Sequence, residues 1–274
     1  MVSKTAIRVM SAALVGVFVM TVVSSQPVLG WPPPIQDDTG FRNNPNPGVY
    51  PPQSSPFGKT YGEWSAEYVQ AVFGNPWNPF EPEGCSFGSQ GTVVFLAATT
   101  GGAQSFSCTL PSGSSLLTPV VTDFEWVPWS CQYVENCTDA DALRAFAKAI
   151  VDATVLLEAE VDGVPVENLA AYRFTSPVFS GTAVEGNIFW QLGLPVVGPY
   201  GPAVADGYWV MLTPLPPGDH VVHIHAVIGD PFPFDGEVTH YITIAPGGGE
   251  ASQPPASTTS VVPSTWGSVK SLYR

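Results

Sequence analysis

Apolar and acidic side chains alternate along residues 155–161. One set of alternate positions is apolar and the other is acidic: Leu157, Ala159 and Val161 against Glu158, Glu160 and, just beyond, Asp162. Successive side chains of a strand point to opposite faces, so the pattern predicts a strand with one buried face and one wet, acidic face. The Asp-Gly pair at 162–163 favours a tight hairpin turn into a short edge strand at 164–166.

The same period-two alternation recurs in short segments along the rest of the chain. It predicts strands at 92–98, 104–110, 115–121, 171–175, 207–213, 220–228 and 237–245. The turn residues at 99–102 (TTGG) favour a hairpin between the first two. Many short strands separated by turns predict a mainly β fold, a β-sandwich of immunoglobulin-like or jelly-roll-like type with two packed α-helices.

A helical period marks residues 61–73. The side chains of Tyr61, Trp64, Tyr68 and Val72 follow one another at spacings of three, four and four, which places them on one face. The stripe favours a helix near 61–73 that buries this face in the core. An aromatic stripe could also stack on sugars.

A second helix is predicted at 139–153. Thr138 stands where an N-cap residue stands, and Asp141 three residues later stands where the acid of a capping box stands. The buried stripe of this helix is expected to consist of Leu143, Phe146, Ile150 and Val151.

The N-terminal region has the three parts of a secretory signal peptide. Lys4 and Arg8 precede an apolar stretch of fifteen residues, Val9–Val23, and small residues follow. A membrane span needs about 20 residues, so the stretch is short for a permanent anchor. We expect cleavage after Ser25 or Gly30, and a protein that is secreted or lies in the periplasm or cell envelope.

Composition divides the chain into four parts. We expect a signal peptide at 1–30, a Pro-rich extended arm at 31–56, the folded β-sandwich domain at 57–245 and a flexible tail at 246–274. The arm and the tail are both rich in Pro and small polar residues, which bury too little apolar surface to build a core.

The mature chain is strongly acidic. Seven bases and 23 acids remain after the signal peptide, a net charge of −16. The absence of a basic cluster in the sequence argues against nucleic acid and against anionic membranes as partners. An envelope or extracellular partner is therefore expected, with no membrane span once the signal peptide is removed.

Four cysteines in an exported chain predict two disulfides. Three pairings are possible. We favour Cys85 with Cys108, which would clip a pair of strands, and Cys131 with Cys137, which would close a small loop.

All four histidines lie between residues 220 and 240. In the strands predicted there, alternation places His220 and His240 on the apolar side, so both are expected to be structural. His220 is expected to be a hydrogen-bonded core residue that closes the turn after Gly218.

The other two histidines point to the wet face and suggest a metal site. His223 and His225 lie about 7 Å apart along the strand, and imidazole is the commonest metal ligand in proteins. Glu158 or Glu160, on the wet face of another strand, could complete a set of two histidines and one carboxylate for a divalent metal. The alternative is a solvent-facing pair of histidines.

Tryptophans offer a second kind of site. Trp126 and Trp129 follow Asp123 and Glu125 in the segment before the second helix, so acids and aromatic rings lie close together. With Trp64, these tryptophans could contact a glycan. Catalysis by the two acids would require them to lie in a sugar-binding cleft.

Four segments carry a resemblance to a known family. They are YGEWSAEYVQ (61–70), LRAFAKAIVD (143–152), VDGVPVENLAAYRFTSPVFS (161–180) and ADGYWVMLTPLPPGDHVVHIH (205–225). Together they resemble a family of uncharacterised secreted bacterial proteins, over roughly residues 57–245 and so over nearly all of the folded body. LPPGDH and the strand after it are also similar to the last strands of bacterial immunoglobulin-like sandwiches. The resemblance implies export and a fold, but no reaction.

The sequence contains no phosphate loop, dinucleotide fingerprint, His-Glu-x-x-His or Cys-x-x-Cys motif. No residue is expected to be catalytic, and no cofactor is expected apart from the divalent metal. This favours a non-enzymatic exported protein that binds or helps to build something at the cell envelope or outside the cell. Two alternatives stay open: a metal-binding protein or metalloenzyme that uses His223 and His225, and a carbohydrate-binding module that uses exposed tryptophans.

Overall fold

The computed structural model describes residues 44–76, 84–191 and 193–246. Strands account for 45% of the structure and form two packed sheets, and two helices have seven or more residues. The expected β-sandwich with two packed helices is confirmed. Among these described residues, no helix is long and apolar enough to cross a membrane. The signal peptide, the first part of the arm and the tail after 246 lie outside the described residues.

Sheet A contains six strands. Their order is β1 (Ser86–Gln90), β2 (Val93–Leu96), β4 (Ser115–Trp126), β9 (Gly198–Leu212) and β7 (Arg173–Thr175), and β8 (Phe179–Ala183) also pairs with β9. The antiparallel β4–β9 pair runs from Leu116 opposite Leu212 to Trp126 opposite Ala203. Both strands are longer than predicted, because polar and small residues continue the pairing beyond the apolar run.

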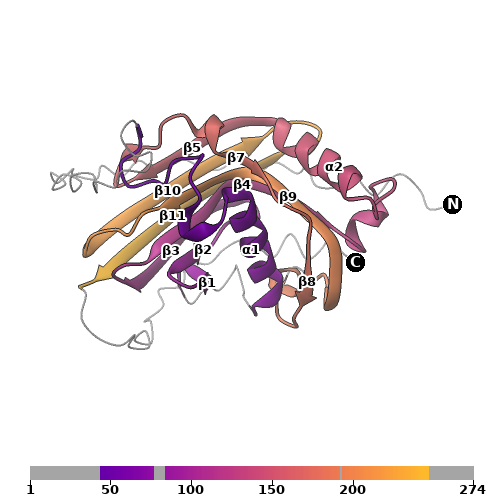
Figure 1. The fold of residues 1–274 in the computed structure, drawn as a ribbon, viewed down its shortest axis with the longest axis horizontal. Helices are drawn as coiled ribbons and strands as arrows, with labels where there is room; N and C mark the ends of the chain where they lie inside the picture. The colour runs from indigo at the N-terminus through magenta and orange to yellow at the C-terminus, as the bar shows by residue number, and fades with distance from the viewer. Residues whose placement is uncertain (1–43, 77–83, 192, 247–274) are drawn as a thin grey trace.

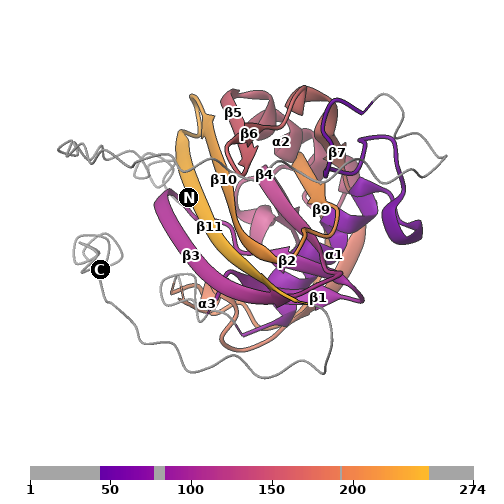
Figure 2. The ribbon, with the colours of Figure 1, turned by 90° about the vertical axis from the view of Figure 1, so that its left-hand side faces the viewer.

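Sheet B contains five strands. Their order is β3 (Gly102–Pro111), β11 (Phe234–Ala245), β10 (Gly218–Ile228), β5 (Thr154–Val161) and β6 (Val164–Pro165). Figure 2 shows β3, β11 and β10 side by side as long curved strands. Alternate residues of β10 and β11 are buried, so one face of sheet B lines the core and the other faces outward. As predicted, the short strand after the Asp-Gly turn is an edge.

The hairpin predicted across 99–102 is wrong. β2 lies in sheet A and pairs with β1 and β4, whereas β3 lies in sheet B and runs parallel to β11. Residues 99–101 therefore carry the chain from one sheet to the other. Phe95 of β2 and Phe106 of β3 reach the same main core from opposite sheets, and this shared burial outweighs a local pairing of the two strands.

Helix α1 (Tyr61–Gly74) matches the predicted helix. A capping box holds its first turn, because Glu63 N–H donates to the side chain of Thr60 and Thr60 N–H donates to the carboxylate of Glu63. The predicted face is buried. Tyr68 Oη donates to the carbonyl of Leu96 at 2.8 Å, which ties the helix to β2.

Helix α2 (Ala140–Asp152) begins one residue later than predicted. Its N-cap is Asp139, whose carboxylate accepts from the N–H of Asp141 at 3.0 Å. The capping box expected from Thr138 and Asp141 is therefore wrong, because the chain turns helical only after Asp139. The buried residues of this helix are Leu143, Ala147 and Val151.

The helices lie on opposite faces of sheet A. Along β9, Ala203 and Ala205 pack in one cluster with residues of α1, whereas Val204 between them packs with Leu143 of α2. Figure 1 shows α1 and α2 on the two sides of β9. The main core, between sheets A and B, also receives the aromatic stripe of α1.

Within residues 44–76, 84–191 and 193–246, the remaining helical elements are single turns. They are α3 (Ile188–Gln191) and three 3₁₀ turns at Pro56–Gly58, Trp129–Gln132 and Leu169–Tyr172. The strand predicted at 171–175 thus begins only at Arg173, because the residues before it form the last of these turns.

Both favoured disulfides are present. Cys85 bonds to Cys108 with their Cα atoms 5.3 Å apart, and Cys131 bonds to Cys137 with a separation of 5.0 Å. The first was expected to clip a pair of strands, and this expectation is wrong. The bond joins the start of sheet A to β3 of sheet B. The second closes the loop before α2.

The described half of the predicted arm packs on the folded body. Val49 forms a bridge with Leu212 at the end of β9 and is 3% exposed. The side chain of Asn46 bonds the backbone of Glu167, accepting from its N–H at 2.6 Å and donating to its carbonyl at 2.9 Å. The domain boundary predicted at 57 therefore falls inside packed structure.

Candidate functional site

The outer face of sheet B gathers histidines and carboxylates. His223 Nε2 lies 2.9 Å from the carboxylate of Glu237, and His225 Nε2 lies 3.0 Å from that of Asp235, both on β11. On the other side, His225 Nδ1 lies 3.7 Å from the carboxylate of Glu158 on β5. Each histidine is thus engaged with acid on a neighbouring strand.

These contacts do not converge on one point. Glu160 lies opposite His223 in the register of β5 and β10, but the nearest partner of that ring is on β11. Within the described part of the chain, no group of three or more His, Cys, Asp or Glu side chains is arranged to hold a metal ion. The proposed set of His223, His225, Glu158 and Glu160 stays a prediction.

His220 lies in the core, on the side that alternation predicted. Its Nδ1 is 2.8 Å from the carboxylate of Asp162, and its Nε2 is 2.8 Å from the carbonyl of Pro216. The same carboxylate accepts from the N–H of Val221 at 2.8 Å. His220 therefore links the turn before β10 to the turn after β5.

His240 is fully buried and stacks on Phe106, with 5.4 Å between ring centres. Among the described residues, neither ring nitrogen has a hydrogen-bond partner. Burial lowers the pKa of His240 to about 4, although the nearby backbone of Ala97 opposes the shift. This ring is a neutral residue of the core.

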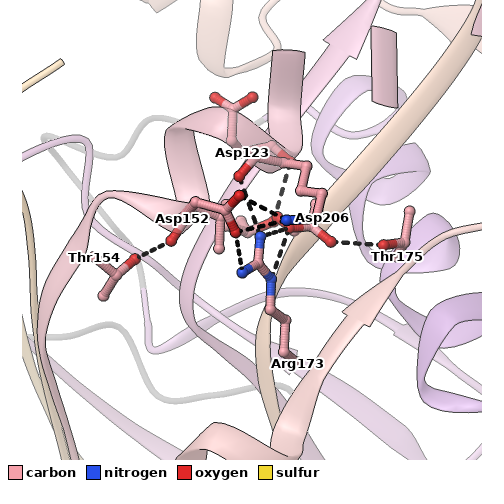
Figure 3. Close-up of polar contacts among 9 residues, drawn as sticks. Asp123, Asp152, Thr154, Arg173, Thr175 and Asp206 are labelled. Carbon is pink, nitrogen blue, oxygen red and sulfur yellow. Dashed lines mark hydrogen bonds and ion pairs between the residues drawn. The ribbon is translucent and has the colours of Figure 1, made fainter. Parts of the chain in front are cut away.

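A partly buried ionic network joins β7, β9 and α2 on the α2 side of sheet A, next to Asp123 of β4 (Figure 3). Asp123 on β4 lies opposite Asp206 on β9. The guanidinium of Arg173 donates to Asp206 from Nε at 2.9 Å and to Asp152 of α2 at 2.6 Å. Thr175 Oγ1 also donates to Asp206, at 2.6 Å. These contacts offset the cost of burying the negative charge of Asp206, which is almost completely buried.

Asp123 and Glu125 are neighbouring carboxyls on one face of β4. Burial is the main cause that raises the pKa of Asp123 well above its usual range, and the charge of Glu125 adds to it. Burial also raises the pKa of Glu125, but hydrogen bonds from Ser130 and Tyr133 oppose the increase. Both carboxyls therefore hold a proton up to a higher pH than they do in water, and the hydrogen bonds from Ser130 and Tyr133 limit this effect at Glu125.

Glu125 fastens the turn Trp129–Gln132 to the end of β4. Its carboxylate accepts from the hydroxyls of Ser130 and Tyr133, the latter at 2.8 Å. Ser130 Oγ accepts in turn from the N–H of Trp126 at 2.8 Å. Because only 2% of Glu125 is exposed, this acid is a buried anchor and not an open catalytic group. The two acids lie beyond the strand predicted at 115–121 but within the observed strand β4.

A groove of about 410 Å³ lies beside this turn, and we call it the aromatic groove. One wall comes from the end of β4 and the turn, and the other from residues 194–200. Its lining includes Trp126, Trp129, Gln132, Pro195, Val197 and Tyr200. The indoles of Trp126 and Trp129 are nearly parallel, at 11°, with 6.0 Å between their centres.

Two of the three tryptophans expected to contact a glycan are buried. Trp64 is 2% exposed and donates from Nε1 to the carbonyl of Pro56 at 2.9 Å, so it belongs to the core. Trp126 is 4% exposed. Core burial, which the stripe favours for Trp64, is confirmed. The alternative of exposed tryptophans at positions 64 and 126 is wrong, because α1 and the β4–β9 pair bury them. Trp129 is partly exposed and lines the groove.

Two groove residues carry buried polar atoms without a hydrogen bond. These atoms, Trp126 Nε1 and Tyr200 Oη, have no partner among the described residues. Tyr200 Oη sits directly over Gly181, where an added Cβ would come within 2.6 Å of it. Unpaired buried polar groups are uncommon and call for an explanation.

The sequence offered little sign of this groove. Residues 194–200 (LPVVGPY) have no clear period, and they reach the Trp129–Gln132 turn only because Trp126 pairs with Ala203. The Pro and Gly residues at 195–199 were the one available signal, since they mark an irregular segment next to an aromatic residue.

Comparison with known proteins identifies no relative: no family model, no curated protein and no solved structure matches the chain. The resemblance to secreted bacterial proteins stays a prediction.

Proposed function

We propose that this is a non-enzymatic protein that works outside the cytoplasm and binds its ligand in the aromatic groove. The observation that carries the proposal is the chemistry of that groove, with mostly apolar walls that include Trp129 and one side-chain amide, that of Gln132. Ligand sites have this composition, because apolar surface provides affinity while a few polar groups fix orientation.

Export is supported by two independent features. The two disulfides suggest an oxidising, extracytoplasmic environment. The N-terminal bases followed by fifteen apolar residues have the pattern of a secretory signal. The partner or ligand is therefore sought in the cell envelope or outside the cell.

An enzymatic function has less support. The carboxyls of Glu125 and Asp206 are each 2% exposed and hydrogen-bonded within the protein. General acid–base catalysis needs a group within hydrogen-bond reach of the substrate. Neither of these acids is among the residues that line the aromatic groove.

A charge placed in the groove tests the proposal. Val197 lines the groove and is 54% exposed, so Val197→Glu should fold normally and add a carboxylate to an apolar wall. Val178→Glu is the matched control, because Val178 is 46% exposed and does not line the groove. The mature chain is titrated by calorimetry with an oligoproline peptide, chito-oligosaccharides and a medium-chain fatty acid.

We expect one of these ligand classes to bind, with an affinity at least about tenfold weaker for Val197→Glu and unchanged for Val178→Glu. An added charge that must be desolvated in an apolar site opposes binding by more than 1.4 kcal/mol, which is about tenfold. If none of the three classes binds, or if Val197→Glu binds as the wild type does, the groove is not the ligand site.

A further inference from the structure

Strand β3 forms a free edge of sheet B. It pairs with β11 on one side, and among the described residues no strand pairs with its other side. Figure 2 shows β3 on the outer side of β11. In a strand that is paired on one side only, alternate residues turn their N–H and C=O groups away from the sheet. The outer side of β3 therefore offers backbone donors and acceptors to another strand.

The other sheet edges in the described part of the chain have features that oppose pairing with another chain. β6 has two residues, one of them Pro165, and β7 has three. β1 and β8 have five residues each, and a register shift interrupts the pairing of both. Short strands, proline and bulges are common means by which sheet edges avoid association.

Strand β3 has none of these features. It is ten residues long, its pairing with β11 runs without a register shift from Gly102 to Pro111, and its one proline is the last residue. A charged side chain on the edge would be a further means of protection. However, β3 has no charged residue, and none occurs between Glu83 and Asp123. This edge is therefore open to an extended segment of another chain.

The distribution of charge selects the occupant. Seven bases and 23 acids give the mature chain a net charge of −16, so two copies repel each other, and they do so least at an uncharged edge. A basic segment would be drawn away from β3, because Glu158, Glu160 and Asp219 lie on strands at least two positions away. On the neighbouring strand, Glu237 lies opposite Ala103, near one end of β3.

The side chains of β3 suit pairing of this strand with itself. Phe106 and Leu110 point to the core, and the residues that alternate with them point outward. Side chains directly opposite each other in an antiparallel pair lie on the same face. A twofold axis therefore places the outward side chains of one copy opposite those of the other, with no charge and little bulk between them. These exposed side chains are Ala103, Ser105, Ser107 and Thr109.

We propose that β3 pairs in antiparallel orientation with β3 of a second copy, so that the two five-stranded sheets continue as one sheet across a twofold axis. The inference does not depend on the proposed function, because no residue of β3 lines the aromatic groove. It gives the protein a second interaction surface, which receives another copy of the same chain.

The test measures the oligomeric state of the mature chain by sedimentation equilibrium. Ser105→Lys/Ser107→Lys places two charges on exposed positions at the centre of the edge. Thr239→Lys/Tyr241→Lys is the matched control, because these residues lie opposite Ser105 and Ser107 on β11 and so occupy the same rows. In the proposed dimer the control lysines of the two copies lie three strand spacings apart, about 14 Å, which exceeds the screening length of about 8 Å. Thermal melting checks that both variants fold.

We expect the wild type to be a dimer at about 100 μM and to dissociate on dilution to about 1 μM, as a small interface does. The edge variant should dimerise at least about tenfold more weakly than the control, because like charges then lie directly opposite each other. High salt should strengthen the wild-type dimer and restore part of the dimer of the edge variant, since it screens both repulsions.

A second measurement does not depend on the lysine variants. With the twofold axis at the centre of β3, the two Ser107 side chains lie within about 8 Å of each other. Ser107→Cys should therefore be linked to its copy by a short bismaleimide, whereas Tyr241→Cys should not be linked.

Three results would overturn the proposal. The first is a wild type that stays monomeric at every concentration, whatever other strand the edge receives. The second is a dimer that the edge variant and the control weaken equally, which places the interface elsewhere. The third is a dimer in which Ser107→Cys is linked no faster than Tyr241→Cys.

Discussion

Burial of two ionisable residues sets part of the response of this protein to pH. The pKa of His240 is lowered to about 4 by burial, and that of Asp123 is raised by burial and by the charge of Glu125. The two shifts act in opposite directions on stability, because the histidine resists gaining a proton and the acid resists losing one. The effect of either residue on the pH dependence of stability is therefore measured with a variant that replaces that residue alone.

Acid should destabilise the protein through His240. Below its ordinary pKa of 6.5 the unfolded chain binds a proton at this ring, while the folded chain binds it only near pH 4. The contribution to stability is therefore complete above pH 6.5 and is lost as the pH falls to about 4, a change of about 3 kcal/mol. Urea unfolding of the wild type and of His240→Leu between pH 7.5 and 4 measures it. Parallel pH profiles for the two proteins would contradict the assignment.

Sequence alternation predicted the faces of the histidines because the side-chain period of a strand is local. The same argument could not find the stack of His240 on Phe106, since that ring comes from β3, which pairs with β11 across a long separation in sequence. Likewise, the carboxylates nearest His223 and His225 are on β11. The predicted partners, Glu158 and Glu160, lie on β5.

At the scale of elements, Arg173 fastens β7 and β9 to α2. Its guanidinium reaches Asp206 on one strand and Asp152 at the end of the helix, and it lies 5.7 Å from the ring centre of Tyr208. Only 3% of the Asp206 side chain is exposed. A buried carboxylate of this kind depends on its partner, because desolvation without compensation is costly.

Removal of Arg173 should be much more damaging than removal of a surface base. Arg173→Met leaves the buried Asp206 with its hydrogen bond from Thr175 but with no positive charge beside it, and we expect a loss of about 3 kcal/mol in the free energy of unfolding. Lys148→Met is the control, because Lys148 pairs with Asp152 on the surface and is 62% exposed, so its loss should stay below about 1 kcal/mol. Denaturant unfolding measures both. The double variant Arg173→Met/Asp206→Leu should recover most of the stability, and a failure to recover would show that the arginine acts by packing alone.

The length of β9 shows that small residues required by close packing can hide a strand in the sequence pattern. Its predicted start was 207, yet the strand begins at Gly198. No strand is predicted before 207, but Ala203 and Ala205 belong to β9 and are small because α1 packs against them. Gly207 has a different origin, since an added Cβ would lie 2.6 Å from the carbonyl oxygen of Val121 on the paired strand β4. Close approach to the helix and to the neighbouring strand, and not chain reversal, explains this composition.

At the scale of the whole molecule, the two disulfides contribute to stability in different ways. Cys85–Cys108 joins the two sheets over 23 residues, whereas Cys131–Cys137 closes a loop of six. The longer loop restricts the unfolded chain more strongly in the entropy model. The shorter one steadies the segment that follows the Trp129–Gln132 turn.

Replacement of each cysteine pair by alanine should show how much each disulfide contributes to the free energy of unfolding. We expect Cys85→Ala/Cys108→Ala to lose about 3 kcal/mol and Cys131→Ala/Cys137→Ala about 2 kcal/mol, as loop length predicts. Guanidinium unfolding under non-reducing conditions measures both losses. Equal or inverted losses would mean that native packing around the short loop, and not chain entropy, dominates.

The sequence by itself determined the mainly β character, the positions of both long helices, the inward faces of His220 and His240 and the favoured cysteine pairs. Each of these follows from local period or from a short list of cysteines. Only the tertiary structure decided that β2 and β3 belong to different sheets, that Trp64 and Trp126 are buried and that residues 194–200 form a groove with Trp129. Those features depend on contacts between segments far apart in the chain, and burial in a shared core selects them over the local signals of the turn at 99–102.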